Sequence, residues 1–410
     1  MISLTDAVRV VLGAVRPLPP EKVSILEARG RVLAEDICAR RSLPPHDNSA
    51  MDGFAVRHQD LGPGVVLQVV EDIPAGATAQ NTLGPGQAAR IMTGAPVPQG
   101  ADTVVPVEDT RPQGDRVEIL SVPGKGANIR PMGEDVEEGE RVLPAGTRLR
   151  PAEVGMLASL GRSFVLVHQR PRVAVLATGD EIVDVDAGDP GTKIINSNSY
   201  GVAAQVAEAG GVPVVLGIGR DDPEGLLEML ERAAPCDVIV TTGGVSVGDY
   251  DYVRPVLARA GVAVQFWKVA MKPGKPVVFG MKGRVPVFGL PGNPVSALVA
   301  FEQFVRPCLL KLQGHRRVFR PMVQAVLAEE AGPVKTKPGR TDLVRCRVEY
   351  REGAFRVVGV HHKGSGVLTT LVRANGLMVI PADSTGAKPG DRVRVQVYDT
   401  TLFDQEDPGL

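Results

Sequence analysis

The sequence has few of the features that mark secreted, zinc-binding or membrane proteins. Its four cysteines form no CxxC pair, which argues against a zinc site or a disulfide framework and predicts reduced thiols at Cys38, Cys236, Cys308 and Cys346. No apolar run approaches the roughly 20 residues that a membrane-spanning helix needs. The first residues, from Met1 to Ala7, lack a charged and then apolar signal region. We therefore expect a cytoplasmic protein without a membrane segment.

An excess of charge and the familiar nucleotide motifs are also missing. The net charge is −1, from 46 basic and 47 acidic residues, which argues against a broad nucleic-acid-binding surface. There is no G-x-x-x-x-G-K-[ST] loop and no G-x-G-x-x-G after an expected strand. P-loop and dinucleotide-binding chemistry are therefore not indicated. The histidines have no metal-binding spacing; they are His46, His58, His168, His315, His361 and His362.

Four apolar segments of strand length between Arg172 and Ser296 each run into a polar turn. Helical segments separate them, and this alternation predicts a doubly wound α/β domain. Right-handed crossovers place all four turns at one edge of the sheet, where such sheets bind ligands. The segments are Val173 to Ala177 before Thr178-Gly179-Asp180-Glu181, Val212 to Ile218 before Gly219-Arg220-Asp221-Asp222, Val238 to Val240 before Thr241 to Asp251, and Val285 to Leu290 before Pro291-Gly292-Asn293-Pro294.

The third of these turns carries the most chemistry. Glycines such as Gly243 and Gly244, with Ser246, let backbone N–H groups approach a phosphate. Asp249 and Asp251 could hold a hard cation. An ordinary strand-to-helix turn with solvated acids is the alternative for this segment alone. Similar chemistry at three other strand ends favours a site for a phosphate and a metal.

The character of the sequence changes along the chain and predicts four domains. The first forty residues are expected to be largely helical, including a segment from Ile25 to Leu33. Short apolar runs cut by proline and glycine then indicate a β-rich insertion. The expected boundaries are 1–43 with 138–168 for a discontinuous helical N-terminal domain, 44–137 for the insertion, 169–315 for the α/β domain and 316–410 for a C-terminal β-barrel.

A basic loop is the strongest signal outside the strand ends. Lys268, Lys272 and Lys275 stand close together in a chain that is poor in lysine, and the proline and glycine between them break any helix. Ammonium groups act as point charges that suit phosphate and tetrahedral oxyanions. A solvated basic loop is the alternative. Weaker anion-binding signals in the C-terminal region are Arg340, Arg345 and Lys363-Gly364-Ser365-Gly366.

Three polar turns in the insertion carry groups that a ligand could contact. The segment from Pro44 to Arg57 is dense in short polar residues and includes Asp52. Thr93 ends a strand pattern, and Asp135 belongs to an acidic turn. A domain-linking turn, a satisfied turn threonine and a solvated acid are the simpler interpretations of these three.

Taken together, these segments resemble the MoeA family of molybdopterin molybdenumtransferases, which are similar to the E domain of gephyrin. The matching segments follow the family's order and cover essentially the whole chain. The resemblance implies a molybdopterin-adenylyltransferase-like central α/β domain with the other three domains around it. It also implies a homodimer whose active site is shared between subunits. The segments are Asp-Asn-Ser-Ala-Met-Asp-Gly-Phe-Ala, Met-Thr-Gly-Ala-Pro, Thr-Gly-Asp-Glu, Gly-Gly-Val-Ser-Val-Gly, Met-Lys-Pro-Gly-Lys-Pro and Leu-Pro-Gly-Asn-Pro-Val-Ser.

The resemblance also implies an activity and its residues. Adenylylated molybdopterin is cleaved with Mg²⁺, molybdate enters the dithiolene, and AMP is released. The implied catalytic residues are Asp52, Thr93 and Asp135, contributed by the second subunit, and Glu181, Asp221 and Asp251, which would hold Mg²⁺. The implied substrate-binding residues are Gly179, Gly243, Gly244, Ser246, Lys268, Lys272, Lys275, Pro291, Gly292, Asn293, Pro294, Ser296, Arg345 and Ser365.

Some choices stay open at this point. Asp249 competes with Asp251 as the metal ligand, although Asp251 is the better positional match. The α/β domain alone also resembles molybdopterin adenylyltransferases, and a non-catalytic scaffold like gephyrin is a second rival. A separate adenylyltransferase could dock to hand over its product. Whether molybdate or tungstate is preferred is also open.

Overall fold

The computed structural model describes residues 1–220, 222–243, 256–351, 353–361 and 364–404. It divides into two compact units. Within the described residues, no helix is long and apolar enough to cross a membrane. The core unit comprises Met1–Val23, Gly30–Ala34 and Leu166–Leu410, and the insertion unit comprises Ser24–Arg29 and Glu35–Val165.

A six-stranded sheet forms the centre of the core unit. Its first four strands are parallel, and its last two are antiparallel to their neighbours. The turns after the parallel strands therefore lie at one edge, as the alternation of strands and helices predicts. The strand order is β17 (Val212–Gly219), β14 (Arg172–Thr178), β18 (Val238–Thr242), β22 (Val285–Leu290), β21 (Val278–Lys282) and β19 (Val262–Trp267).

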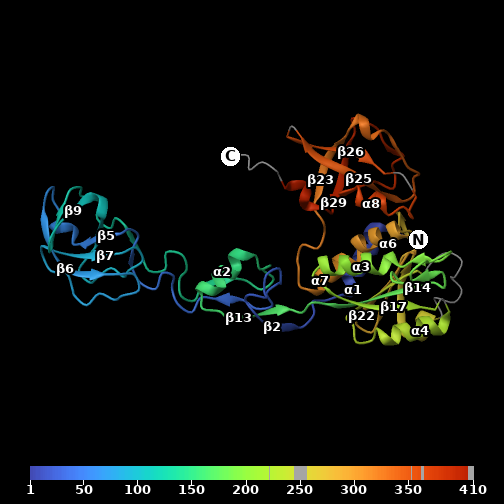
Figure 1. Ribbon diagram of the computed structural model, residues 1–410, viewed down its shortest axis with the longest axis horizontal. Helices are drawn as coiled ribbons and strands as arrows, with labels where there is room; N and C mark the ends of the chain where they lie inside the picture. Colours follow the sequence, from blue (N-terminus) through green and yellow to red (C-terminus); the bar gives the residue numbers. More distant parts are fainter. Residues whose placement is uncertain (221, 244–255, 352, 362–363, 405–410) are drawn as a thin grey trace. The chain divides into compact units, whose positions relative to one another are not determined.

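Helices pack on both faces of this sheet (Figure 1). Residues of β14 alternate between the two cores: Val173 and Val175 belong to one, Ala174 and Leu176 to the other. Because both faces are covered, the strands read as continuous apolar runs, which made them visible in the sequence. The first face carries α1 (Leu4–Ala14), α3 (Ser197–Glu208), α6 (Pro294–Ala300) and α7 (Arg306–Leu312), and the second carries α4 (Pro223–Arg232).

Polar side chains define where these helices begin. Ser3 Oγ accepts a hydrogen bond from the Asp6 N–H at 3.1 Å, and Asn196 Oδ1 accepts one from the Ser199 N–H at 3.2 Å. Asp222 Oδ1 accepts from the Gly225 N–H at 2.6 Å. Each bond satisfies an N–H group that has no partner within its own helix. Asp222, which follows β17, thus caps the start of α4.

The long helix that follows β22 contains a π turn. Helices α6 and α7 are joined by the π-helical segment η3 (Phe301–Val305), all of whose residues are buried. Such turns are rare and often occur at functional sites. Glu302 and Gln303 are the polar residues that this turn carries into the interior.

The C-terminal region forms a closed barrel of five strands, as expected. Strand β25 (Thr341–Arg351) pairs with both β26 (Ala354–Val360) and β27 (Gly376–Ile380). Strands β23 (Met322–Leu327) and β29 (Arg392–Val397) complete the circle. The barrel joins the α/β part through β20 (Val269–Lys272), which pairs in parallel with β25 on one side and with β1 (Ile2–Ser3) on the other. Smaller elements here are η4 (Glu329–Ala331), β24 (Val334–Lys335), α8 (Thr369–Val372), β28 (Gly386–Ala387) and η5 (Thr400–Phe403).

The insertion unit is rich in β structure, as its proline and glycine pattern predicts. Its main sheet has the order β8 (Thr103–Pro106), β5 (Gly53–Val56), β7 (Gln87–Ile91), β6 (Val66–Ile73), β10 (Arg116–Ile119) and β9 (Thr110–Gln113). Helix α2 (Pro151–Ser159) begins with proline, as expected. Smaller elements are β3 (Ile37–Cys38), β4 (Asn48–Ser49), η1 (His58–Asp60), η2 (Val107–Asp109), β11 (Ile129–Arg130) and β12 (Arg141–Leu143).

The helix predicted from Ile25 to Leu33 was wrong. Residues 25–30 form turns after β2 (Pro20–Ser24), and Val32 to Ala34 pair with the strand β13 (Phe164–His168). The Ala34 N–H donates to Leu166 O at 2.9 Å, and Val32 O accepts from the His168 N–H at 3.0 Å. A partner strand more than 130 residues away in the sequence thus overrode the local pattern.

Candidate functional site: two adjoining cavities

A cationic cavity of about 430 Å³ lies in the core unit between the α/β part and the barrel. Residues 271–276 and the start of α6 line it from one part, and β25 lines it from the other. The structure thus brings together segments that are far apart in the sequence. Seven residues predicted to bind substrate line this cavity: Lys272, Lys275, Pro291, Asn293, Ser296, Arg345 and Ser365.

The loop that carries Lys272 and Lys275 has a constrained backbone. Gly274 has a φ of 101°, and a Cβ there would lie 3.1 Å from Met271 Cε and 3.5 Å from Ser296 O. The positive φ therefore favours glycine at this position, and a side chain there would also crowd Met271. Lys275 O also accepts hydrogen bonds from the Val269 N–H at 2.9 Å and the Val277 N–H at 3.1 Å. The exposed side chains of Lys272 and Lys275 consequently extend from a backbone that is held in place by these contacts.

The barrel contributes a buried cation. Arg345 is 7% exposed, and its Nε donates to Thr370 Oγ1 at 3.2 Å. Burial lowers the pKa of this guanidinium, but arginine remains charged in proteins. Ser365 O accepts from the Val295 N–H at 3.0 Å, which ties the barrel to the start of α6. Arg345 thus presents a desolvated positive charge to the cavity.

Sequence reasoning missed part of this lining. Lys335, Arg340, Asp342 and His361 also line the cavity, although Arg340 had been noted as a weak signal. Arg340 Nε donates to Asp342 Oδ1 at 2.9 Å, so the one lining carboxylate is already paired. Five lining side chains are cationic. The segment Lys335-Thr-Lys-Pro-Gly-Arg340 repeats the basic Pro-Gly pattern of the first loop, and this repetition was the available signal.

A second cavity of about 530 Å³ adjoins the first at the ends of the parallel strands. The two linings share Pro276, Pro291 and Asn293. Ile182, Ile194 and Ile195 add an apolar wall that the sequence had not indicated; they lie in or beside β15 (Ile182–Val183) and β16 (Ile194–Ile195). Predicted residues in this lining are Glu181, Gly243, Pro291, Gly292, Asn293 and Pro294.

Glycine is required where two strand ends meet at this cavity. Gly243 has a φ of 93°, and a Cβ there would lie 2.3 Å from Thr178 O. A Cβ on Gly292 would meet only the Gly243 Cα, at 3.8 Å, so the two glycine turns lie close to each other and the rest of the space around Gly292 is open. Asn198 Nδ2 donates to Gly292 O at 2.7 Å and holds this turn. The backbone is thus accessible to a ligand.

The predicted metal site is only partly within the described residues. Glu181 lines the second cavity, and both of its carboxylate oxygens would lie 2.9 Å from a Cβ on Gly179. Asp221, Asp251, Gly244 and Ser246 lie outside the described residues. Among the residues that are described, no group of three or more His, Cys, Asp or Glu could hold a metal. Of the three predicted metal ligands, Glu181 is the one within the described residues, and its carboxylate supplies the hard oxygen that Mg²⁺ prefers.

Among the described residues of the core unit, two predicted site residues line neither cavity. Lys268 is half-buried, with its N–H donating to Val277 O at 3.0 Å. Gly179 lies beside Glu181, behind the second cavity's lining.

The three predicted insertion residues are all exposed. The Thr93 N–H and hydroxyl both donate to Asp52 Oδ1 at 2.7 Å. Both bonds lower the pKa of Asp52 below its usual value, and the backbone N–H bond has the larger effect. Asp135 lies on a separate turn, where its N–H donates to Leu43 O at 3.0 Å.

Comparison with known families accounts for nearly the whole chain. The model for the MoeA N-terminal region (domain I and II) matches residues 2–161, a probable molybdopterin binding domain matches 174–311, and the MoeA C-terminal region (domain IV) matches 328–398. A molybdopterin molybdenumtransferase of Nostoc is 38% identical, with 96% of this chain and 93% of the relative covered. The chain belongs to the MoeA family.

Other members agree with this assignment. Molybdopterin molybdenumtransferase 2 of Mycobacterium tuberculosis is 40% identical and covers 98% of this chain and 100% of its own length. The crystal structure of a molybdopterin biosynthesis MoeA protein from Pyrococcus horikoshii OT3 superposes with a TM-score of 0.81 at 33% identity, covering 97% of this chain and 100% of that one. The resemblance and the fold class inferred from the sequence are thereby confirmed.

Proposed function

We propose that this MoeA family member is a molybdopterin molybdenumtransferase that inserts molybdate into adenylylated molybdopterin and releases AMP. One observation carries the proposal: a cavity with five cationic side chains adjoins a glycine-rich cavity at the edge of a parallel sheet. The first suits a tetrahedral oxyanion and the second suits a phosphorylated heterocycle. Relatives that match nearly the full chain carry this activity in their names.

The cationic cavity is assigned to molybdate. Lys272 and Lys275 supply mobile point charges, and Arg345 supplies a planar donor on a buried, fixed side chain. Ser296 and Ser365 add hydroxyl groups that can donate to oxo ligands. Cysteine ligands are not needed, because the sulfur atoms that receive molybdenum belong to the pterin. The protein's part is to hold the oxyanion beside them.

The second cavity is assigned to the adenylylated pterin. Turns at Gly243 and Gly292 bring backbone near the diphosphate, and Ile194 and Ile195 offer an apolar surface to a planar ring. Because the two cavities adjoin, a pterin bound here could present its dithiolene to the oxyanion. Preorganised donors would then neutralise charge as the phosphoanhydride P–O bond breaks.

A magnesium ion is part of the proposal. Glu181 would hold it together with Asp221 and Asp251, which follow β17 and β18 in the sequence. When bound, Mg²⁺ would neutralise the charge on the diphosphate and the departing AMP. The oxygen of Glu181 has the chemistry that this ion prefers.

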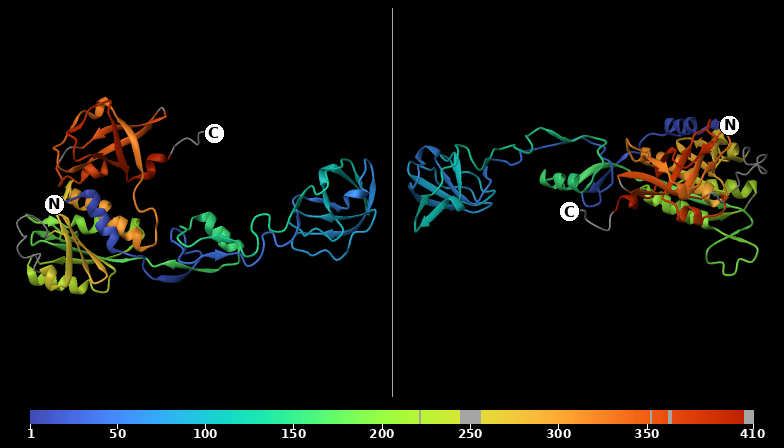
Figure 2. Two further views of the ribbon diagram at one scale, coloured as in Figure 1. Left: turned by 180° about the vertical axis from the view of Figure 1, so that it is seen from behind. Right: turned by 90° about the horizontal axis from the view of Figure 1, so that it is seen from above.

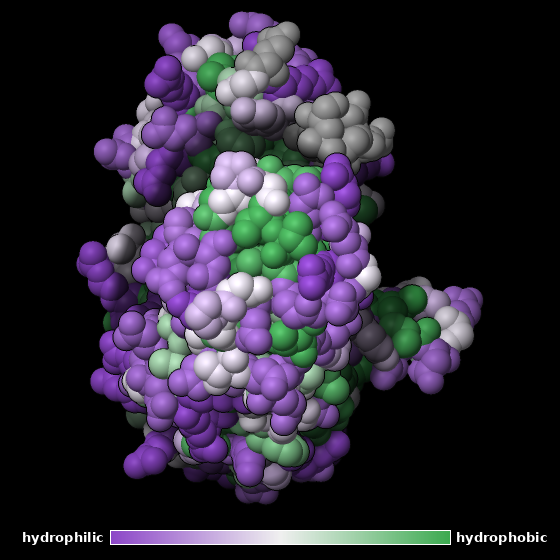
Figure 3. Space-filling model, turned by 90° about the vertical axis from the view of Figure 1, so that its left-hand side faces the viewer, coloured by the Kyte–Doolittle hydropathy of each residue, from purple (hydrophilic) through white to green (hydrophobic). Residues whose placement is uncertain are grey.

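The proposal also includes a homodimer in which each active site is shared between the two subunits. In each subunit, Asp52, Thr93 and Asp135 would complete the site of the other. Apolar side chains gather on the face of the insertion unit seen in Figure 3, which is typical of a surface that associates. Exposed apolar residues of this unit include Met51, Val107, Leu120, Val122 and Met132. We also place the protein in the cytoplasm, with a molybdopterin adenylyltransferase as the source of its substrate.

Purified protein tests the proposal directly. Adenylylated molybdopterin, Mg²⁺ and molybdate should yield AMP, and AMP release should depend on molybdate. Pterin adenylylation from ATP without such release would identify an adenylyltransferase instead. Absence of both reactions, with the protein folded, would leave a scaffold. Sedimentation at several concentrations tests the dimer, and a monomer that is fully active would contradict the shared site.

A further inference from the structure

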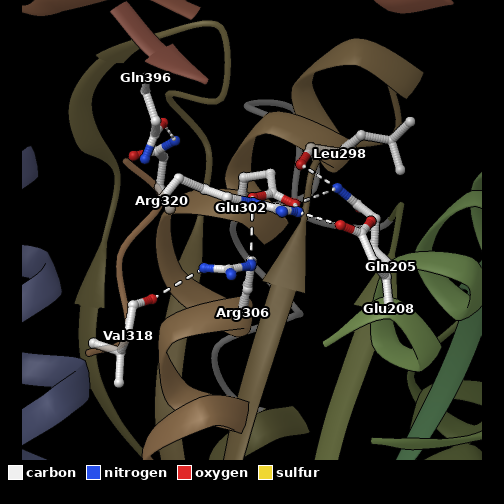
Figure 4. A network of polar contacts seen from close by, with 9 residues as sticks. Gln205, Glu208, Leu298, Glu302, Arg306, Val318, Arg320 and Gln396 are labelled. Atoms are coloured by element: carbon white, nitrogen blue, oxygen red, sulfur yellow. Dashed lines mark hydrogen bonds and ion pairs between the residues drawn. The ribbon is translucent and has the colours of Figure 1, made fainter. Parts of the chain in front are cut away.

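Buried polar side chains connect the π turn of the long helix to the barrel (Figure 4). Glu302 and Gln303 are 8% and 9% exposed, although both carry groups that need partners. Glu302 accepts hydrogen bonds from Arg320 in the connector after α7 and from Gln205 of α3, and Gln303 contacts strand β29. The π turn thus carries polar contacts across the junction between the α/β part and the barrel.

The carboxylate of Glu302 holds the connector that enters the barrel. Arg320, two residues before β23, donates to it from Nε at 3.0 Å and from Nη2 at 3.2 Å. Its Nη2 also donates to Glu208 Oε1 at 2.6 Å. One turn along the helix, Arg306 Nη1 donates to Val318 O at 3.1 Å. Two points of the connector are therefore fixed to the α/β part.

Gln303 contacts the barrel itself. Its Nε2 donates to Gln396 Oε1 at 2.7 Å, and both side chains are 9% exposed. Gln396 on β29 is paired with Leu377 on β27, and Leu377 is paired with Arg345 on β25. The buried amide pair is thus two strand steps from the guanidinium that lines the cationic cavity.

We infer that the Gln303–Gln396 pair, supported by Glu302 and Arg320, positions Arg345 for the oxyanion. This inference rests on the proposed function of the cavity. Leu343 and Leu377 of the barrel pack into the apolar core of the α/β part, but apolar packing tolerates small shifts. A hydrogen bond between buried polar groups requires a defined geometry, so this pair favours the arrangement in which Arg345 and Lys272 line the same cavity.

Molybdate binding to the full-length protein, measured by equilibrium dialysis, tests the inference. The double variant Gln303→Leu/Gln396→Leu removes both polar groups and keeps their approximate volume. We expect its dissociation constant for molybdate to rise about fivefold or more. In an Arg345→Ala background the same change should have less than about a twofold effect, because the positioned group is already absent. Equal effects in both backgrounds, or none in the wild-type background, would overturn the inference.

A matched control separates positioning from general stability. Gln313 is also buried, at 5% exposed, but its side chain donates to Ala209 O and Leu309 O within the α/β part. Gln313→Leu should lower the melting temperature and leave molybdate affinity unchanged. If the double variant does not fold, Arg320→Lys provides the second test, because it keeps the charge and loses the two-point contact. Arg320→Lys should weaken molybdate binding in the wild-type background and have little effect in the Arg345→Ala background.

The outcomes also distinguish this inference from the proposed function. Wild-type protein that binds no molybdate, or an Arg345→Ala variant that binds it normally, would remove the proposed function of the cavity. If wild-type protein binds molybdate and Arg345→Ala weakens this binding, but the double glutamine variant does not, only the positioning role is contradicted.

Discussion

The two cavities of the core unit differ in the groups that line them. The cationic cavity uses long side chains from two parts of the chain, whereas its neighbour uses glycine turns at the ends of parallel strands. Side-chain charge can be moved or lost one residue at a time. Backbone access depends on Gly243, where a φ of 93° and the nearby Thr178 O exclude any other residue. The first cavity should therefore respond to charge changes, and the second to added volume.

The largest effect is expected at Arg345. Arg345→Ala removes a buried, charge-assisted donor, so kcat/KM for molybdate should fall about 100-fold, since such bonds contribute ~1.5–3 kcal/mol. Affinity for AMP should change little, because Arg345 does not line the second cavity. Steady-state kinetics and calorimetry of AMP binding measure both. Equal losses of molybdate and AMP recognition would show that the cavities do not act separately.

Gly243 provides the reciprocal experiment. A Cβ at this position would lie 2.3 Å from Thr178 O, so Gly243→Ala must displace a strand end. We expect AMP affinity to fall about tenfold and unfolding free energy to fall by ~1–3 kcal/mol, the range for local backbone strain. Gly283→Ala is the control, because its φ of 59° is similar in sign and its Cβ would have no neighbour within 4 Å. If the control alters AMP affinity as much, backbone access is not the cause.

A smaller effect is expected at Lys335. This exposed side chain lines the cationic cavity from the barrel, where solvent screens its charge. Lys335→Met should raise the KM for molybdate about threefold at low salt, and the difference should shrink as ionic strength rises. Kinetics over a salt series measure this. A difference that does not depend on salt would indicate a packing effect instead.

The smallest effect concerns the insertion unit, which has neither cavity. Thr93→Val removes the hydroxyl donor to Asp52 and keeps the backbone donor, so the pKa of Asp52 should rise toward its usual value without reaching it. A lowered carboxyl pKa stabilises the fold at pH values above the unfolded pKa, and this contribution is lost as pH falls through the folded pKa. The variant should therefore be less stable than wild type near neutral pH, and the difference in stability should shrink in acid. Carbon-13 NMR titration reports the shift. An unchanged pKa would mean that the backbone bond alone sets it.

Residues near the strand ends were predictable because local pattern and fold agree. Val173 to Ala177 reads as a strand covered on both faces, and Gly243 and Gly292 occur where such strands must turn. Lys272 and Lys275 were identifiable because a proline and a glycine hold charged residues on a loop. Ile194 and Ile195 were missed, since an apolar wall made of two short strands has no distinctive period.

The helix predicted from Ile25 to Leu33 was wrong for a related reason. Its apolar spacing fits a helix, but its hydrogen-bond partners come from residues 166–168. The boundaries drawn at 44, 138, 169 and 316 and the roles assigned to individual site residues remain predictions. Asp221 and Asp251 belong with them, because they lie outside the described residues.

By itself, the sequence determined the alternation of strands and helices, the glycine turns and the basic loop, because each follows from neighbours along the chain. Only the tertiary structure decided that Arg345 and Lys335 of the barrel share a cavity with Lys272, and that Gln303 meets Gln396. These contacts depend on how the barrel packs against a helix, and that packing minimises exposed apolar surface and unpaired polar groups over the whole core unit rather than within any one segment.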